Sequence, residues 1–388
     1  MTDSRKQKAG AALCFGILFL LTFFMVFVEM GKGDEVLEYS DFATHSSWAV
    51  KELADPLYDK FFSYPVWHFM VRGIYLLLPV GRECAAALVT AVCIGGTAGL
   101  LFLFLWRQLG KKLSWGRICL LDIGLLVLTA LYMPWFNTEV YLGQSSPTIW
   151  HNPTNMAVKP IALAVFLWFM KICSREKEGS WTEFIILGAM LLLSCFIKPS
   201  FVQGFLPAAG VFLLIIFLKD YRTWFGICWK TAVSFLLPCV YFVIQYFSVF
   251  GGNTDRGIGI APFEVMKMDT AHPLISILQA AAFPLFVFLL TGWKKAFRDH
   301  YMLLAGLFYI VSLLEFILLI EVQEAASGNF EWALQLSLFV LFAVTAVRFY
   351  QSDAKGLARL AGNALLGYHC LSGIFYYLQI IFWLPGQC

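Results

Sequence analysis

Residues 9–30 read AGAALCFGILFLLTFFMVFVEM, and this stretch decides the class of fold. A helix needs about 20 apolar residues to cross a bilayer, because hydrocarbon offers no partner for backbone N–H and C=O groups. The run is too long for a signal-peptide core of about 7–15 residues, and no small-residue cleavage motif follows it. Arg5, Lys6 and Lys8 precede it, which favours a cytoplasmic N-terminus. The stretch therefore predicts an uncleaved membrane anchor.

The rest of the chain is equally apolar. Of its 388 residues, 60% are hydrophobic and 14% are charged, and the mean hydropathy is +0.74. An average soluble domain has about 45–50% apolar and about 25% charged residues. The net charge of +3 gives no reason to expect a nucleic-acid partner. We predict a multi-pass, all-α protein of the cell membrane, with residues 1–388 forming one transmembrane domain in contact with membrane lipids.

Hydropathy and basic loops together predict about 11 membrane-spanning helices. They are expected at residues 9–30, 84–106, 118–134, 153–172, 182–197, 201–218, 226–250, 273–292, 301–320, 332–350 and 360–384. The apolar stretch at 65–80 contains His68 and Arg72. Counting it as a span would place the basic cluster at 107–117 outside, against the positive-inside tendency, so we predict an interfacial or re-entrant helix there.

The first external loop, residues 31–82, is rich in acids. Carboxylates gather near its start at Asp34, Glu35, Glu38 and Asp41. A carboxylate there can take a proton from an attacking hydroxyl or hold a divalent cation, but it can equally be a solvated loop residue. Asp41 stands apart because an interfacial helix, expected over residues 47–62 and interrupted by Pro56, would hold it at the membrane surface.

The second external loop interleaves aromatic rings with hydrogen-bonding side chains. Its candidates for sugar binding are Glu139, Gln144, His151 and Asn152. Such a mixture suits a sugar, since rings stack on C–H faces and polar groups bind hydroxyls. The alternative is an ordinary interfacial aromatic belt, with Asn152 as a helix N-cap before a proline at the first helical position. Both interpretations are open at this stage.

Two cations near the external loops are candidates for binding a phosphate. Lys198 precedes Pro199 at the outer end of a predicted span, and Arg256 lies in a glycine-containing external loop. A guanidinium suits phosphate because it donates two parallel hydrogen bonds. Lys198 can instead snorkel to the interface, and Arg256 can pair with the neighbouring Asp255. His45 and His68, in the first external loop, complete the candidate substrate-binding residues.

The order of these features resembles the N-terminal module of the GT-C superfamily, the glycosyltransferases that use polyprenyl-phosphate sugars, in its bacterial form. The resemblance rests on a first span followed by Asp41 and His45 in the external loop, and then by YPVWH at residues 64–68. Two departures concern the motif itself: Phe42 follows Asp41 where a second acid is typical, and the proline-rich stretch is reduced to Pro65. The large soluble C-terminal domain of some members is also missing.

The resemblance implies a hexosyl- or pentosyltransferase that acts on the outer face of the membrane, with a polyprenyl-phosphate sugar as donor and an envelope glycan or lipid as acceptor. It implies that Asp41 is the base of an inverting transfer and that Lys198 or Arg256 stabilises the departing phosphate. Asp34 or Glu35 would then assist, or hold a divalent cation such as Mg or Mn. A lipid-linked sugar flippase or transporter, and an O-antigen-type polymerase or ligase, are the alternatives. Whether the later external loops meet Asp41 is left undecided.

Overall fold

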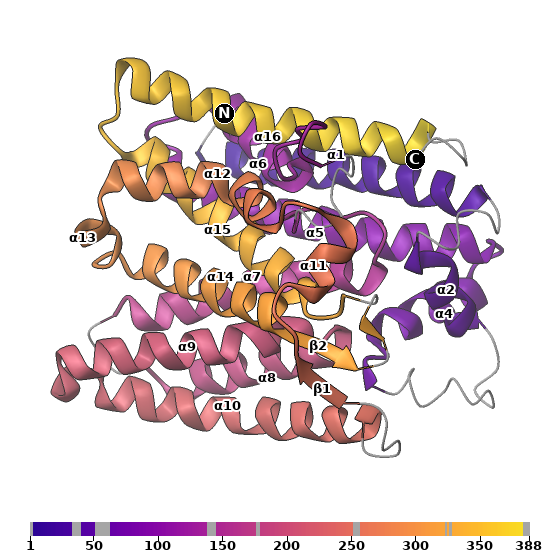
Figure 1. Cartoon of the computed structure of the whole chain (residues 1–388), viewed down its shortest axis with the longest axis horizontal. Helices are drawn as coiled ribbons and strands as arrows, with labels where there is room; N and C mark the ends of the chain where they lie inside the picture. The colour runs from indigo at the N-terminus through magenta and orange to yellow at the C-terminus, as the bar shows by residue number, and fades with distance from the viewer. Residues whose placement is uncertain are drawn as a thin grey trace.

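The computed structural model describes residues 3–32, 40–50, 63–137, 145–175, 179–250, 257–322, 324–325 and 328–382, except the side chains of 249 and 250. The described chain is almost entirely helical, with long helices that run roughly side by side (Figure 1).

In chain order, the helices are α1 (Asp3–Gly31), α2 (Asp41–Val50), α4 (Val66–Leu77), α5 (Arg82–Leu109), α6 (Trp115–Val127), α7 (Pro153–Cys173), α8 (Trp181–Ile197), α9 (Ser200–Lys219), α10 (Tyr221–Phe250), α11 (Glu264–Asp269), α12 (Pro273–Thr291), α13 (Trp293–Ala296), α14 (His300–Leu318), α15 (Glu331–Gln351) and α16 (Gly356–Phe382). Two short strands, β1 (Gly257–Ile260) and β2 (Leu319–Val322), pair antiparallel with Gly257 opposite Val322. Strand β1 replaces a predicted loop, whereas β2 begins within the span predicted at residues 301–320.

Among the described residues, nine helices are long and apolar enough to cross a membrane: α1, α5, α7, α9, α10, α12, α14, α15 and α16. They confirm the prediction of an all-α, multi-pass membrane protein. Two of the predicted spans differ. Residues 182–197 form α8, an apolar helix of 17 residues that is shorter than the nine, and residues 118–134 are helical only as far as Val127. The 12-residue helix α4 is too short to span, as predicted.

The early end of α6 has a structural cause. Beyond Val127 the chain is extended and buried, and partners from distant helices take up its backbone groups. The N–H of Thr129 donates to the carbonyl of His369 at 3.2 Å, and the ring Nδ1 of His369 lies 2.7 Å from the Thr129 carbonyl. Gly373 permits this approach, because a Cβ there would lie 1.9 Å from the Val127 carbonyl oxygen. Non-helical backbone survives at membrane depth only where protein satisfies it.

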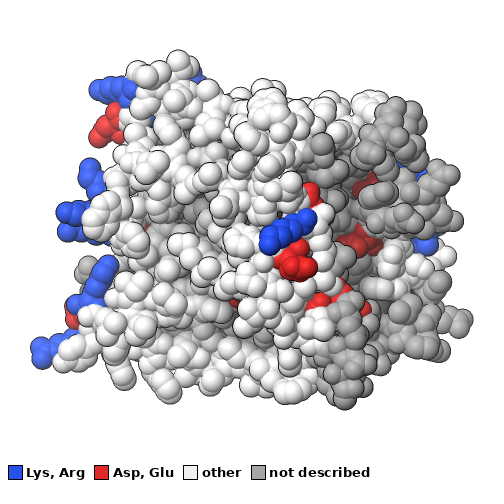
Figure 2. Space-filling view, viewed as in Figure 1, with Lys and Arg blue, Asp and Glu red and all other residues white. Residues whose placement is uncertain are grey.

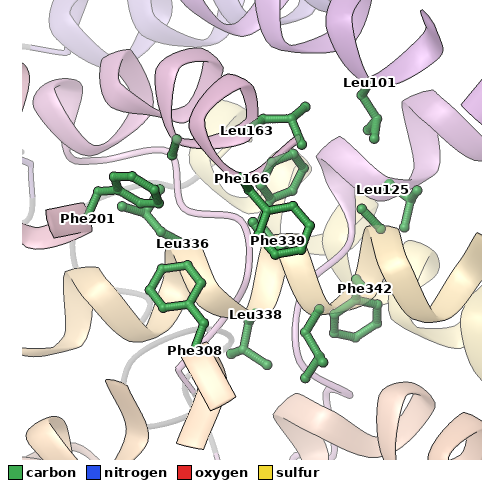
Figure 3. Close-up of a cluster of buried hydrophobic side chains, with 14 of the residues drawn as sticks. Leu101, Leu125, Leu163, Phe166, Phe201, Phe308, Leu336, Leu338, Phe339 and Phe342 are labelled. Carbon is green, nitrogen blue, oxygen red and sulfur yellow. The ribbon is translucent and has the colours of Figure 1, made fainter. Parts of the chain in front are cut away.

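Helix α15 is the centre of the bundle. Of its most apolar 18-residue window, 94% is buried, whereas the corresponding value for α1 is 28%. Phe339 and Phe342 of α15 lie among buried leucines and phenylalanines from several other helices (Figure 3). The ring of Phe342 stacks on Phe283 of α12 with centroids 6.0 Å apart. Dispersion contacts of this kind hold a membrane bundle together, since lipid supplies little hydrophobic drive between helices.

The two ends of the bundle differ in charge. Exposed lysines and arginines gather at the end that carries α13, which is the left end in Figure 2 and is called the basic end below. They include Arg5, Lys6, Lys8, Arg107, Lys111, Lys112, Lys219, Arg222, Lys294, Lys295 and Arg298. The opposite end carries α2, α4, β1 and β2, and is called the α2–α4 end (Figure 1).

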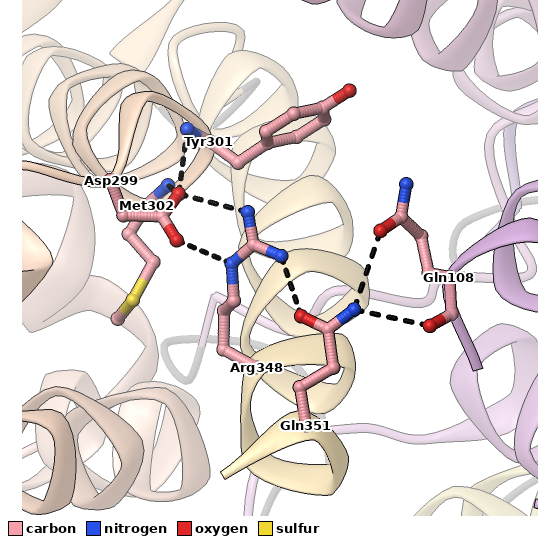
Figure 4. A network of polar contacts seen from close by, with 6 residues as sticks. All are labelled: Gln108, Asp299, Tyr301, Met302, Arg348 and Gln351. Carbon is pink, nitrogen blue, oxygen red and sulfur yellow. Dashed lines mark hydrogen bonds and ion pairs between the residues drawn. The ribbon is translucent and has the colours of Figure 1, made fainter. Parts of the chain in front are cut away.

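A polar network ties helices together at the basic end (Figure 4). The guanidinium of Arg348 in α15 pairs with Asp299, the N-cap of α14, with Nε 2.5 Å from Oδ2. Arg348 also donates to the side chain of Gln351 at 2.7 Å, and Gln351 donates to the carbonyl of Gln108 in α5 at 3.1 Å. The ends of α5, α14 and α15 are therefore fixed to one another.

Candidate functional site

Asp41 is the first residue of α2 and lies at the α2–α4 end. Its backbone N–H donates to the carbonyl of His151 at 3.0 Å, which joins the start of α2 to the segment before α7. The interfacial helix was expected over residues 47–62, but α2 begins at Asp41. A carboxylate in the first turn favours this start, because it complements the positive end of the helix dipole. The described part of this helix ends at Val50, and residues 51–62 lie outside the described chain.

Asn152 holds Asp41 from the second loop. Its Oδ1 accepts the N–H of Asn155 at 2.9 Å and so caps α7, while Pro153 occupies the first turn, as the capping interpretation predicted. Since the oxygen faces the helix, the amide nitrogen is the group left to face Asp41, and it donates to Oδ2 at 2.6 Å. Helix capping therefore fixes which atom the carboxylate meets.

Lys198 reaches the same amide from a third segment, between α8 and α9. Its ammonium donates to Asn152 Oδ1 and to the hydroxyl of Thr154, both at 3.2 Å, and lies 4.8 Å from the ring centre of Trp332. Only 6% of the residue is exposed, so the snorkelling alternative is wrong. Burial lowers the pKa of Lys198 to about 8, and the nearby Asp41 and Glu321 oppose that shift.

Three histidines surround this centre. Nδ1 of His45 in α2 lies 2.8 Å from Nε2 of His68 in α4, and both residues are buried. Burial, together with the positive charge of Lys198, lowers the pKa of His45 well below its usual value and that of His68 to about 4. His151 packs beside Trp332 with ring centroids 5.4 Å apart, and burial lowers its pKa to about 4 against the opposing effect of Asp41. At neutral pH the three rings are uncharged.

The structure thus brings six of the predicted site residues into one region: Asp41, His45, His68, His151, Asn152 and Lys198. The other predicted site residues, Asp34, Glu35, Glu139, Gln144 and Arg256, lie outside the described residues. Within the described part of the chain, no group of three or more metal-ligating side chains is found. The divalent cation suggested for Asp34 and Glu35 stays a prediction.

Two residues at the site were not singled out from the sequence. Glu29, at the end of α1, is buried and lies near Ser40 and Asp41. An acid inside an apolar span is a sufficient signal for it, because such residues are costly in a membrane. Trp332 has no comparable signal, since a tryptophan at the start of a span is typical of an interfacial belt.

A polar path continues from the site into the bundle. Asn155, next along α7 from Thr154, donates from its amide to the side-chain oxygen of Gln335 in α15 at 3.0 Å, and both residues are buried. Deeper in α7, the ammonium of Lys159 donates to the carbonyl of Pro147 at 3.2 Å. Lys159 therefore anchors the segment before α7, one turn or more below the amide that holds Asp41.

Comparison with models of known protein families finds no match, and a search of curated protein sequences finds no relative. A fold alone does not imply an activity, so the geometry and chemistry of the site carry the functional argument.

Proposed function

We propose that the chain is a membrane glycosyltransferase that moves a hexosyl or pentosyl group from a polyprenyl-phosphate donor to an envelope glycan or lipid acceptor, as the GT-C resemblance implies. One observation carries the proposal. A single amide, that of Asn152, contacts a carboxylate through its nitrogen and an ammonium through its oxygen. A base and a phosphate-binding cation are the two groups that such a transfer needs, and here both contact one amide.

Asp41 is proposed as the base. Its carboxylate accepts the acceptor's hydroxyl proton as the acceptor oxygen forms a bond to the anomeric carbon. The bond between that carbon and the phosphate oxygen breaks on the opposite side, which inverts the configuration. The Asn152 amide holds the carboxylate at 2.6 Å and fixes the oxygen that faces away from it. General-base catalysis of this kind contributes about 10²–10⁴-fold to a rate.

Lys198 is proposed to stabilise the departing lipid phosphate, which leaves with the electron pair of the broken bond. Below its pKa of about 8 the ammonium carries a charge, and burial strengthens its interaction with a phosphate. The neutral rings of His45, His68 and His151 give the site hydrogen-bonding groups without adding competing charges. A sugar hydroxyl suits such neutral donors and acceptors.

The charge asymmetry of the bundle supports an outward-facing site. Lysines and arginines mark the cytoplasmic side of membrane proteins, and here they gather at the basic end, opposite Asp41. On this orientation the N-terminus is cytoplasmic. A lipid-linked donor then fits the location, because nucleotide sugars are not normally available outside the cytoplasm.

The proposal is tested with purified protein, radiolabelled polyprenyl-phosphate sugars and envelope acceptors. Asp41→Asn should keep its thermal stability in detergent within a few degrees of wild type and lose transfer by at least about 100-fold. Asp353→Asn, an exposed acid at the basic end, is the matched control and should transfer normally. Near wild-type turnover by Asp41→Asn would remove Asp41 as the base.

The flippase alternative is favoured by one observation, the interrupted helix α6, because discontinuous helices are common in transporters. Proteoliposomes distinguish the two functions. A flippase moves the labelled lipid to the other leaflet without forming a glycosidic bond, whereas the glycosyltransferase forms one. A polymerase or ligase would instead require a lipid-linked glycan, or the lipid A core, as its acceptor. The same assay tests this when these acceptors are supplied.

A further inference from the structure

A cavity opens beside Arg117, and its inner end reaches Trp150, the residue before His151 of the site. It has a volume of about 780 Å³ and runs between α6 and α16, which lie side by side near the top of Figure 1. Its walls are apolar, with Leu120 and Ile123 on one side and Leu366 and Ile374 on the other. Ligand-binding cavities typically measure about 300–1,000 Å³, so the space is large enough for part of a lipid.

The cavity is about one membrane leaflet deep. It extends along α6 from Arg117 to Val127, roughly 15 Å at the rise of an α-helix. The hydrocarbon core of a bilayer is about 30 Å thick, so each leaflet contributes roughly 15 Å. The rings of Trp150 and Tyr377, 5.8 Å apart, line its inner end. Its length therefore matches a lipid tail that enters from the basic end.

The mouth of the cavity is built to receive an anion. Arg117 lines it, is exposed, and makes no ion pair with any residue that the structure describes. Arg117 also lies in the first turn of α6, whose N-cap Ser114 gives no side-chain hydrogen bond to the helix. Free N–H groups at a helix N-terminus, together with the helix dipole, attract phosphate.

Polar neighbours complete the mouth. The hydroxyl of Tyr350 donates to the side-chain oxygen of Asn363 at 3.0 Å, and both residues line the cavity. Arg359 also lies close to Tyr350, although Nε and both of its terminal nitrogens already donate to the carbonyls of Ala354, Phe349 and Ser352. Arg117 is thus the cation here whose donors are left for a ligand.

We propose that this cavity binds an anionic glycerophospholipid from the leaflet at the basic end, with its phosphate at Arg117 and the α6 N-terminus and one tail between α6 and α16. Charge complementarity selects an anionic headgroup, and the apolar walls and leaflet depth select an acyl tail. The sugar donor is not the expected occupant, because its phosphate would meet Lys198 and Asp41, whereas the cation of this cavity, Arg117, lies at its opposite end from Trp150 and the site. The site is independent of the proposed glycosyltransferase activity.

Native mass spectrometry of the purified full chain tests this with dioleoyl phosphatidylglycerol and dioleoyl phosphatidylcholine as probes. Wild type should retain one phosphatidylglycerol in preference to phosphatidylcholine. Arg117→Ala should bind phosphatidylglycerol about tenfold more weakly, because a charge-assisted contact is lost. Arg222→Ala, which removes another exposed arginine of the basic end, should bind it as wild type does.

A second pair of variants tests the tail. A Cβ at Gly367, which lines the cavity, meets no atom within 4 Å, so Gly367→Phe can fill the space without disturbing the fold. It should lose the retained lipid, whereas Leu371→Phe, on an exposed face of α16, should keep it. Thermal unfolding of each variant checks folding. Equal retention of both lipids by wild type, or undiminished phosphatidylglycerol binding by Gly367→Phe, would overturn the proposal.

Discussion

Asn152 combines a structural and a proposed catalytic role, and two substitutions separate them. Asn152→Ala removes the N-cap of α7, which costs about 1 kcal/mol. It also removes the hydrogen bonds to Asp41 and Lys198, and bonds to charged groups are worth about 1.5–3 kcal/mol each. The loss of stability should therefore be about 4–7 kcal/mol, because both charges stay buried with fewer partners.

Asn152→Asp keeps the cap, since Asp and Asn cap helices about equally well. It also keeps an oxygen near Lys198, but it places a second carboxylate where the amide contacted Asp41 at 2.6 Å. Two carboxylates this close cannot both ionise, so one of their pKa values rises strongly and they share a proton. We expect stability to fall by much less than in Asn152→Ala, and transfer at pH 7 to fall by about 100-fold or more, because the base is largely protonated.

The assay combines thermal unfolding in detergent with the rate of sugar transfer between pH 6 and pH 9. Transfer by Asn152→Asp should recover as the pH rises and the shared proton is lost, whereas Asn152→Ala should show no such recovery. Equal melting temperatures for the two variants would refute the capping contribution. Wild-type transfer by Asn152→Asp at pH 7 would refute the role assigned to the amide beside Asp41.

Substitutions at Lys198, Gly373 and Phe339 test other parts of the structure, with Gly367→Ala as a control. Transfer by wild type should decline as the pH rises through about 8, because Lys198 loses its charge there. Lys198→Arg should remove that decline from the pH–rate profile, because a guanidinium stays protonated. Gly373→Ala should destabilise the protein by about 1–3 kcal/mol in thermal unfolding, since the new Cβ would lie 1.9 Å from the Val127 carbonyl; Gly367→Ala, which meets open space, should leave stability unchanged. Phe339→Ala, at a fully buried position of α15, should cost about 3–5 kcal/mol, and a loss below 1 kcal/mol would contradict the central place of that helix.

Much of the fold follows from local sequence. The nine long helices were predicted because crossing a bilayer demands an apolar run of fixed length, which hydropathy reads directly. The end of helix α6 was not predictable in this way. Its continuation is just as apolar, but His369 and Gly373, some 240 residues later, make an extended path possible by supplying hydrogen bonds and room. The pairing of β1 with β2 is similarly invisible, since four-residue strands far apart in the chain leave no local pattern.

In the site, too, local features were predictable from the sequence and contacts between distant segments were not. Asn152 and Pro153 form a local capping signal, so the start of α7 was predictable from two adjacent residues. The contact of Asn152 with Asp41 joins residues 111 positions apart, and its contact with Lys198 joins residues 46 apart. Hydropathy places all three near the same membrane face but says nothing about which loops touch. Packing of the whole bundle decides that.

The central position of α15 has a consequence for how the protein is made. Its first residue is Glu331, so the ribosome has already synthesised α1 to α14 before the helix at the centre of the bundle exists. Until then the inward faces of the earlier helices, including Phe283, which later stacks on Phe342, must be covered by lipid or by one another. Pairs such as α1 with α5 can pack earlier, but the contacts that α15 makes with α5, α9, α12 and α14 form only after it enters the membrane.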